Sequence, residues 1–220
     1  MHITYHGLSC FKIVAKTAGR GSDDVTVILG PFDKSTGLKP LQTKADLAVM
    51  PHKSAEFAPA DGLRGEPIML TMPGEYAVAG INVVSLAAPA DMRGGQERGN
   101  ATISILDVED MKLVYLGALG AELTPDQYDA GAGADIVFLP IGDEQGIDGK
   151  TAEDVARKLE AKVIVPMHYK SKKAGIKGLR DEKDFCSNIG SCPKKSIEKM
   201  TIKAADVADK SMEVVMLTVS

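Results

Sequence analysis

Tryptophan is absent from this 220-residue chain, and other aromatic residues are few, with five Tyr and five Phe. Without a series of aromatic side chains, the sequence offers no stacking platform for single-stranded nucleic acid. Its apolar runs are also short, and none approaches the roughly 18 consecutive residues of a transmembrane helix. The N-terminal segment alternates apolar and polar residues, unlike a secretion signal. We therefore expect a cytoplasmic protein that has no membrane partner.

Cysteine is equally scarce. The three residues, Cys10, Cys186 and Cys192, form no closely spaced pair of the kind that makes zinc knuckles or redox sites. Cys186 and Cys192 are near enough in sequence to meet across a short loop, but unpaired thiols are the favoured interpretation for a chain of this size in a reducing compartment.

Positive charge is concentrated in one segment of an acidic chain. The net charge is −4, yet residues 157–203 hold 13 Lys or Arg against 5 Asp or Glu, a local charge of +8 that leaves −12 for the rest. A solvated basic surface is the favoured interpretation. Nucleic-acid binding through residues 157–203 is a weaker alternative, because overall acidity and the few aromatics oppose it.

The pattern of short apolar runs predicts one domain over residues 1–220 with a β-rich first half. Strands are expected at residues 3–5, 10–15, 25–29, 46–50, 68–71, 76–78, 81–87, 101–106 and 112–116. Helix signals appear later: Thr124 and Pro125 begin one short helix, and another should run from Thr151 to about Ala161. Buried strands at 136–139 and 163–165 and a last strand at 212–219 complete a fold of mixed sheets covered by helices.

Several short motifs, each weak alone, occur in a distinctive order. They are Gly7-Leu8-Ser9-Cys10-Phe11, Gly30-Pro31-Phe32-Asp33, Ala45-Asp46-Leu47, Pro73-Gly74-Glu75-Tyr76, Glu97-Arg98-Gly99, Leu116-Gly117-Ala118-Leu119-Gly120 and Val165-Pro166-Met167-His168-Tyr169. Together they resemble the metallo-β-lactamase superfamily, in the branch of metal-dependent hydrolases related to ascorbate-6-phosphate lactonase. The resemblance covers about residues 1–170. It implies an α+β fold of four αββα layers, with two mixed β-sheets packed face to face and helices outside.

Active members of that family hold two divalent metals with a His-x-His-x-Asp-His loop, a third His, a bridging Asp and a final His. Here the resemblance matches the first and final ligands to His52 and His168. It implies that the other ligand positions have changed, and they are occupied by Ser54, Glu56, Phe57, Ala90 and Ala118. Asp91 lies next to the position of the third His. Leu8 and Gly30 stand where the family has a His and an Asp that support the ligands.

These replacements favour a non-catalytic protein with a binding, assembly or regulatory role and no cofactor, in which only His52, Glu56, Asp91 and His168 remain from the family site. Its partners are unidentified, and a homo-oligomer is one option. The alternative is a hydrolase of a small phosphorylated or lactone-type substrate, with one weakly bound zinc or manganese held by His52, Glu56 and His168. Both interpretations predict that His52 and His168 converge at one end of the sheets.

Basic residues follow the final family position directly. Lys170, Lys172 and Lys173 come just after His168, where the family's strand opens onto the active-site face. An anion-binding rim and a solvated loop are both compatible with this run, and the solvated loop is favoured.

Overall fold

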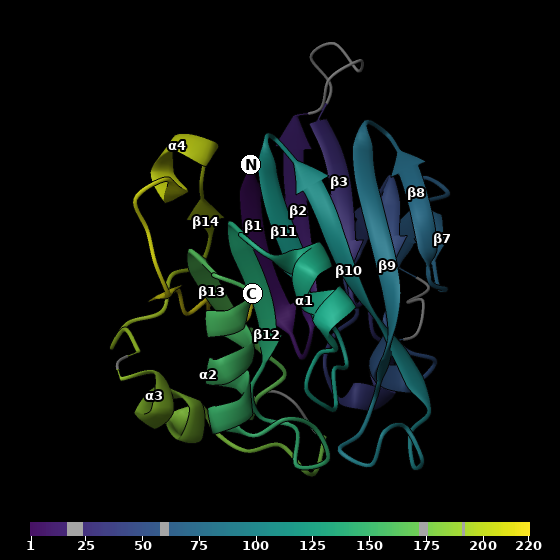
Figure 1. Cartoon of the computed structure of the whole chain (residues 1–220). Coiled ribbons are helices and arrows are strands. Elements are labelled where there is room, and N and C mark those ends of the chain that lie inside the picture. Colours follow the sequence, from purple (N-terminus) through teal and green to yellow (C-terminus); the bar gives the residue numbers. More distant parts are fainter. Residues whose placement is uncertain (17–23, 58–61, 172–175, 191) are drawn as a thin grey trace.

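Two β-sheets form the centre of the molecule (Figure 1). The computed structural model describes residues 1–16, 24–57, 62–171, 176–190 and 192–220. The six-stranded sheet has the order β14 (Met200–Thr201), β1 (His2–Gly7), β2 (Cys10–Lys16), β3 (Asp24–Leu29), β5 (Leu47–Val49) and β7 (Ile68–Leu70). The seven-stranded sheet has the order β15 (Glu213–Val214), β13 (Val163–Met167), β12 (Ile136–Pro140), β11 (Met111–Tyr115), β10 (Asn100–Val108), β9 (Ile81–Pro89) and β8 (Gly74–Val78). A small separate ladder pairs β4 (Thr43–Lys44) with β6 (Leu63–Arg64).

Each large sheet is mixed. In the six-stranded sheet, β14, β1, β2 and β3 are antiparallel, whereas β3, β5 and β7 are parallel. In the seven-stranded sheet, β8 to β11 are antiparallel, and β11, β12, β13 and β15 are parallel. The central parallel strands β12 and β13 are fully buried and almost wholly apolar, as strands covered on both faces must be.

Helices lie outside the sheets. They are α1 (Pro125–Gly131), α2 (Gly149–Lys158), α3 (Lys183–Ile189) and α4 (Ala204–Val207), and 3₁₀ turns occur at Lys34–Thr36 and Ala55–Phe57. Figure 1 shows α1 and α2 in front of the seven-stranded sheet, with the N-terminal strands on its far side. Among the described residues, no helix has both the length and the apolar character that crossing a bilayer requires.

Apolar packing follows these layers. One cluster fills the space between the sheets, with Phe11, Val27, Tyr115 and Phe138 among its members. A second joins the outer face of the seven-stranded sheet to α1, α2 and α3. The predicted fold, two mixed sheets face to face with helices outside, is confirmed.

Some elements differ from the prediction. Helix α2 begins at Gly149, not Thr151, because the side chain of Asp148 caps it by accepting the amide hydrogen of Thr151 at 2.8 Å. The predicted strand at 212–219 is reduced to β15 and single bridges at Leu217 and Val219. Helices α3 and α4 were not predicted, since both are short and carry weak apolar periodicity.

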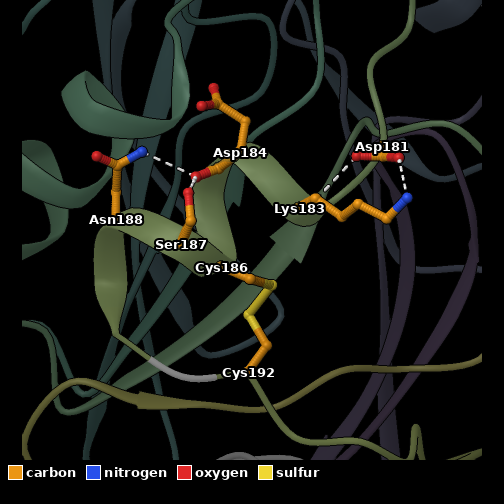
Figure 2. The surroundings of a disulfide bond; sticks show 7 residues. All are labelled: Asp181, Lys183, Asp184, Cys186, Ser187, Asn188 and Cys192. Atoms are coloured by element: carbon orange, nitrogen blue, oxygen red, sulfur yellow. Dashed lines mark hydrogen bonds and ion pairs between the residues drawn. A yellow bond between two sulfur atoms is a disulfide. The ribbon is translucent and has the colours of Figure 1, made fainter.

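The expectation of three free thiols is wrong. Cys186, in the middle of α3, forms a disulfide with Cys192 (Figure 2), while Cys10 is free and buried. The chain reverses after α3 through Gly190, whose φ of +92° suits glycine, and this brings the two Cα atoms to 5.3 Å. The spacing of the two cysteines in the sequence does not predict this reversal of the chain.

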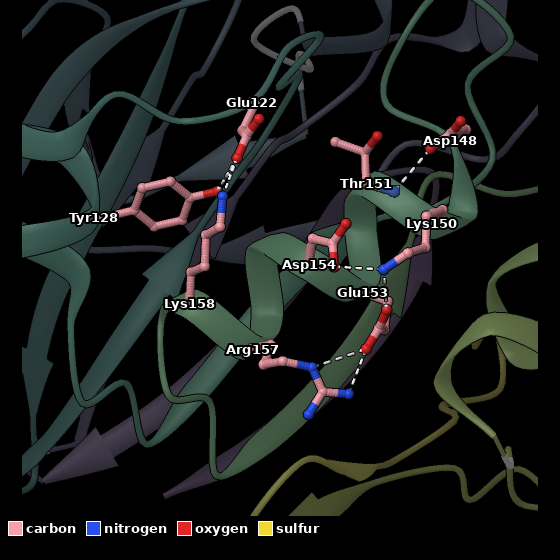
Figure 3. A network of polar contacts seen from close by, with 9 residues as sticks. All are labelled: Glu122, Tyr128, Asp148, Lys150, Thr151, Glu153, Asp154, Arg157 and Lys158. Carbon is pink, nitrogen blue, oxygen red and sulfur yellow. Dashed lines mark hydrogen bonds and ion pairs between the residues drawn. The ribbon is translucent and has the colours of Figure 1, made fainter.

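Some of the basic residues in 157–203 are paired with acids. Around α2, Arg157 pairs with Glu153 and Lys158 with Glu122 (Figure 3). Lys162 pairs with Asp135 at 2.7 Å. Arg157 and Lys158 are also exposed, with 65% and 53% of their side chains accessible, which fits the favoured interpretation of a solvated surface.

Candidate functional site

The carboxyl ends of several strands meet at one edge of the two sheets. Chain segments that follow β5, β9, β11, β12 and β13 supply the residues of this edge, where loops from parallel strands commonly build binding sites. The sheets are joined here by the amide of His168, which donates to the carbonyl oxygen of Leu8 at 2.7 Å. His168 has a φ of +54°, an uncommon conformation for a residue with a side chain.

An apolar cluster lies in the middle of this edge. It consists of Phe57, Ala90, Ala101 and Ala118, and we call it the Phe57 cluster. Three of its four members are positions where the resemblance implies a replaced metal ligand. The structure therefore brings Phe57, Ala90 and Ala118 together, and their side chains carry no atom that could bind a metal.

The ring of Phe57 is fully buried and contacts both histidines of the edge. It stacks on the imidazole of His168 with centroids 5.9 Å apart and meets that of His52 edge-on at 6.3 Å. His52 and His168 thus lie at the same edge, sharing one aromatic neighbour. They line different clefts, however, because His52 faces a cleft of about 540 Å³ beside Thr71 and Met72, and His168 faces another of about 550 Å³.

His52 is held by a neighbouring loop. Its Nε2 donates to the carbonyl oxygen of Arg98 at 2.7 Å, which fixes the tautomer and leaves Nδ1 as an acceptor. This Nδ1 is buried, and it has no hydrogen-bond partner among the described residues. The same holds for Ser54 Oγ and Glu56 Oε2, which belong to the same loop.

His168 is almost wholly buried, with 4% of its side chain exposed. Its Nε2 lies 3.4 Å from Glu56 Oε2 and 3.9 Å from Asp143 Oδ2, so the ring hydrogen is favoured on Nε2. Ser9 Oγ, 3.0 Å from Nδ1, then acts as the donor there. Burial lowers the pKa of His168, and the two carboxylates act in the opposite direction.

Arg98 lies beside the same two carboxylates. One terminal nitrogen of its guanidinium pairs with Asp143, and the other is 3.9 Å from Glu56 Oε2. All three side chains are largely buried, with exposed fractions of 17% for Arg98 and Asp143 and 24% for Glu56. Together with His168 they line the 550 Å³ cleft, next to Ser54, Glu144 and Lys177.

Asp91 does not point into this arrangement. One of its carboxylate oxygens accepts the amide hydrogens of Arg93 and Gly95, and the other accepts those of Glu97 and Arg98. These hydrogen bonds lower the pKa of Asp91, with the Arg98 amide the largest contributor. Asp91 therefore organises the loop that carries Arg98 and has no oxygen left facing the cleft.

Leu8 and Gly30, at the positions where the family has residues that support the metal ligands, are closely packed. Leu8 is buried, and its carbonyl oxygen also accepts the hydroxyl hydrogen of Tyr5 at 2.7 Å. At Gly30, an added Cβ would lie 2.3 Å from the Tyr115 hydroxyl and 2.7 Å from the Ser9 carbonyl oxygen. The Tyr115 hydroxyl thus takes the space that a larger residue at position 30 would need.

Lys170 follows His168, and its backbone amide donates to the Arg180 carbonyl oxygen. Lys172 and Lys173 lie outside the described residues. The sequence interpretation did not assign roles to Arg98 and Asp143, although Arg98 occurs in one of the motifs. For Asp143 a signal existed, since this carboxylate follows the buried strand at 136–139 where parallel strands place functional groups.

Among the described residues, no group of three or more His, Cys, Asp or Glu side chains is placed to hold a metal ion. What the edge contains is a mixed network of two carboxylates, one guanidinium and one buried imidazole. Such a network can bind a polar molecule through charge-assisted hydrogen bonds.

Comparison with known proteins identifies relatives of the whole fold. A Listeria monocytogenes protein named UPF0173 metal-dependent hydrolase is 24% identical, with 77% of this chain and 85% of that protein covered. A Bacillus subtilis protein of the same family name is 26% identical over 77% of this chain and 86% of its own length.

Solved structures with a similar fold include proteins described as hydrolases. A Thermotoga maritima protein, described as a candidate Zn-dependent hydrolase of the metallo-β-lactamase superfamily, is 25% identical with a TM-score of 0.74 and covers 98% of this chain and 97% of its own. A metallo hydrolase from Ignicoccus hospitalis, 18% identical with a TM-score of 0.62, covers 92% of this chain and 99% of its own and shows the same fold. Residues 2–168 match the model of the beta-lactamase superfamily domain. The chain therefore belongs to the beta-lactamase superfamily, and these relatives carry the names of metal-dependent hydrolases.

Proposed function

We propose that this protein is a non-catalytic, metal-independent member of its family, in which the 550 Å³ cleft beside His168 binds a small polar molecule. The Phe57 cluster carries the proposal. A divalent metal in a catalytic site needs at least three protein ligands and a position open to water. Here an aromatic ring contacts both candidate histidines, and the alanines beside it offer no donor.

The residues present therefore do not fit the metal that the family implies. His52 and His168 line different clefts. Both carboxylate oxygens of Asp91 accept backbone amide hydrogens of its own loop, and Glu56 lies near the guanidinium of Arg98. These side chains support no hydrolytic step through a metal-activated water. Binding remains available, because the cleft presents charged and hydrogen-bonding groups on several elements.

Metal content tests the proposal. Protein purified without added metal should hold well under one equivalent of zinc, manganese or iron per chain by elemental analysis. Chelation with EDTA should leave the melting temperature unchanged, because a metal bound only by the folded state would raise it by mass action. One or two tightly held metals, or a large decrease in melting temperature with EDTA, would contradict the proposal.

A mononuclear hydrolase is the second candidate, with His52, Glu56 and His168 as ligands of zinc or manganese. It is favoured by the names of the relatives and by the buried atoms His52 Nδ1 and Glu56 Oε2, which have no hydrogen-bond partner among the described residues. Turnover of a small phosphorylated or lactone-type substrate by protein supplied with zinc or manganese, abolished in His168→Asn, would establish it. Absence of turnover together with metal-free protein would favour the first candidate.

A further inference from the structure

Three potential metal donors converge beside Arg98. His168 Nε2 faces Glu56 Oε2 at 3.4 Å and Asp143 Oδ2 at 3.9 Å. In a tetrahedral zinc site with bonds of about 2.1 Å, neighbouring donor atoms are separated by roughly 3.4 Å. Two of the three separations in this set thus approach those of a metal site, although Asp143 is at no position where the family resemblance implies a ligand.

The guanidinium of Arg98 provides a reason why these donors do not form a metal site. Its two terminal nitrogens face different carboxylates, Asp143 on one side and Glu56 on the other. A planar cation with this fork geometry suits carboxylates well and stays charged at all relevant pH values. It neutralises part of the repulsion between two largely buried carboxylates, which would otherwise favour binding of a cation from solution.

We propose that Arg98 is the resident cation of the site, and that its side chain prevents His168, Glu56 and Asp143 from holding a divalent metal. The inference rests on the proposed metal independence and extends it to a cause. The backbone of residue 98 has a separate task, since its amide donates to Asp91 and its carbonyl accepts from His52. A side-chain substitution therefore removes the charge and leaves the loop's hydrogen bonds available.

Zinc titration of matched variants tests this inference. Wild type, Arg98→Gln and Arg98→Lys are titrated with zinc chloride by calorimetry at neutral pH. We expect Arg98→Gln to bind zinc at least about tenfold more tightly than wild type, equivalent to about 1.4 kcal/mol. Arg98→Lys keeps the positive charge but loses the fork that faces both carboxylates, so its gain in zinc affinity should be smaller than that of Arg98→Gln. In Arg98→Gln/His168→Asn the gain should vanish, which separates this site from surface histidines.

The melting temperature provides a second test, which still applies if Arg98→Gln is less stable than wild type. With the guanidinium removed, the carboxylates of Glu56 and Asp143 repel, so Arg98→Gln should melt lower than wild type without metal and regain stability when zinc is added. No gain in affinity and no recovery with zinc would overturn the role of Arg98 and leave the proposed function intact. Tight zinc binding by wild type itself would overturn both.

Discussion

Phe57 is the residue on which the character of the site depends. Its ring is fully buried among Ala90, Ala101 and Ala118 and stacks on His168. Phe57→Ala should decrease the free energy of unfolding by about 3–5 kcal/mol, because it leaves a cavity as well as losing buried apolar surface.

Urea denaturation of Phe57→Ala and wild type measures the effect. Met72→Ala is a suitable control, since Met72 is 64% exposed and its truncation should change little. A Phe57→Ala protein as stable as wild type would mean that the ring is not packed as described.

His6 makes stability depend on pH. Burial, assisted by the charge of Lys12, lowers its pKa from 6.5 to about 4. The unfolded chain therefore binds a proton at a higher pH than the folded protein does. The contribution of His6 to the free energy of unfolding is fully present above about pH 6.5, and it decreases as the pH falls toward about 4.

Denaturation midpoints measured at several pH values between these limits should decrease as the pH is lowered. His6→Gln should make this dependence of the midpoint on pH less steep. His168, whose pKa burial also lowers, adds a decrease of the same sign that His6→Gln leaves in place. An identical slope in His6→Gln and wild type would count against the predicted contribution of His6.

Residue identity predicted part of this site. Motif order names Phe57, Ala90 and Ala118 as positions where the resemblance implies a replaced ligand, and the structure places these three residues together. The roles of Arg98 and Asp143 could not be assigned, because their pairing depends on the path of two loops far apart in sequence. The loop path in turn depends on Asp91, whose four backbone contacts leave no trace in residue spacing.

At the scale of elements, α2 shows how local signals set a boundary. Asp148 caps the first turn, and the paired charges of Lys150, Glu153 and Arg157 follow one face of the helix (Figure 3). Asp148→Ala should decrease the free energy of unfolding by about 1 kcal/mol, because the amide of Thr151 loses its acceptor.

Thermal or urea unfolding can test this, with Lys150→Ala as the control. The Lys150 ammonium is solvent-exposed, so its ion pairs should contribute nothing measurable. An equal effect of both substitutions would show that the cap is not the source of the change.

Elements with strong local patterns were predictable and weakly patterned ones were not. The capping box of α1, with Thr124 and Gln127 bonded reciprocally, confirms the start predicted at Thr124 and Pro125. The C-terminal region lacks such signals. There, β14 and β15 are two residues long and form through pairing with β1 and β13. The predicted strand at 212–219 contains β15 but overstates its length, and β14 was not predicted.

For the whole molecule, the packing between the sheets predicts how the chain unfolds. A single apolar cluster contains residues of both sheets, including Phe11 from one and Phe138 from the other, whose rings are 4.7 Å apart. Neither sheet can separate without exposing this surface. Calorimetry should therefore show one cooperative transition with equal calorimetric and van't Hoff enthalpies. Two resolved transitions would contradict the prediction of a single domain over residues 1–220.

The Phe57 cluster also bears on how such a protein can evolve. It is small and distinct from the clusters that hold the sheets and helices together, so changes at the edge leave the main core untouched. Where an alanine or phenylalanine occupies a position at which the resemblance implies a metal ligand, that residue adds apolar packing at that edge. The reverse path is far less accessible. A single return to His or Asp would bury a polar group without its partners, a destabilising step until several others have also returned. Descendants of this chain are therefore more readily selected for new ligands in the cleft than for recovery of a metal.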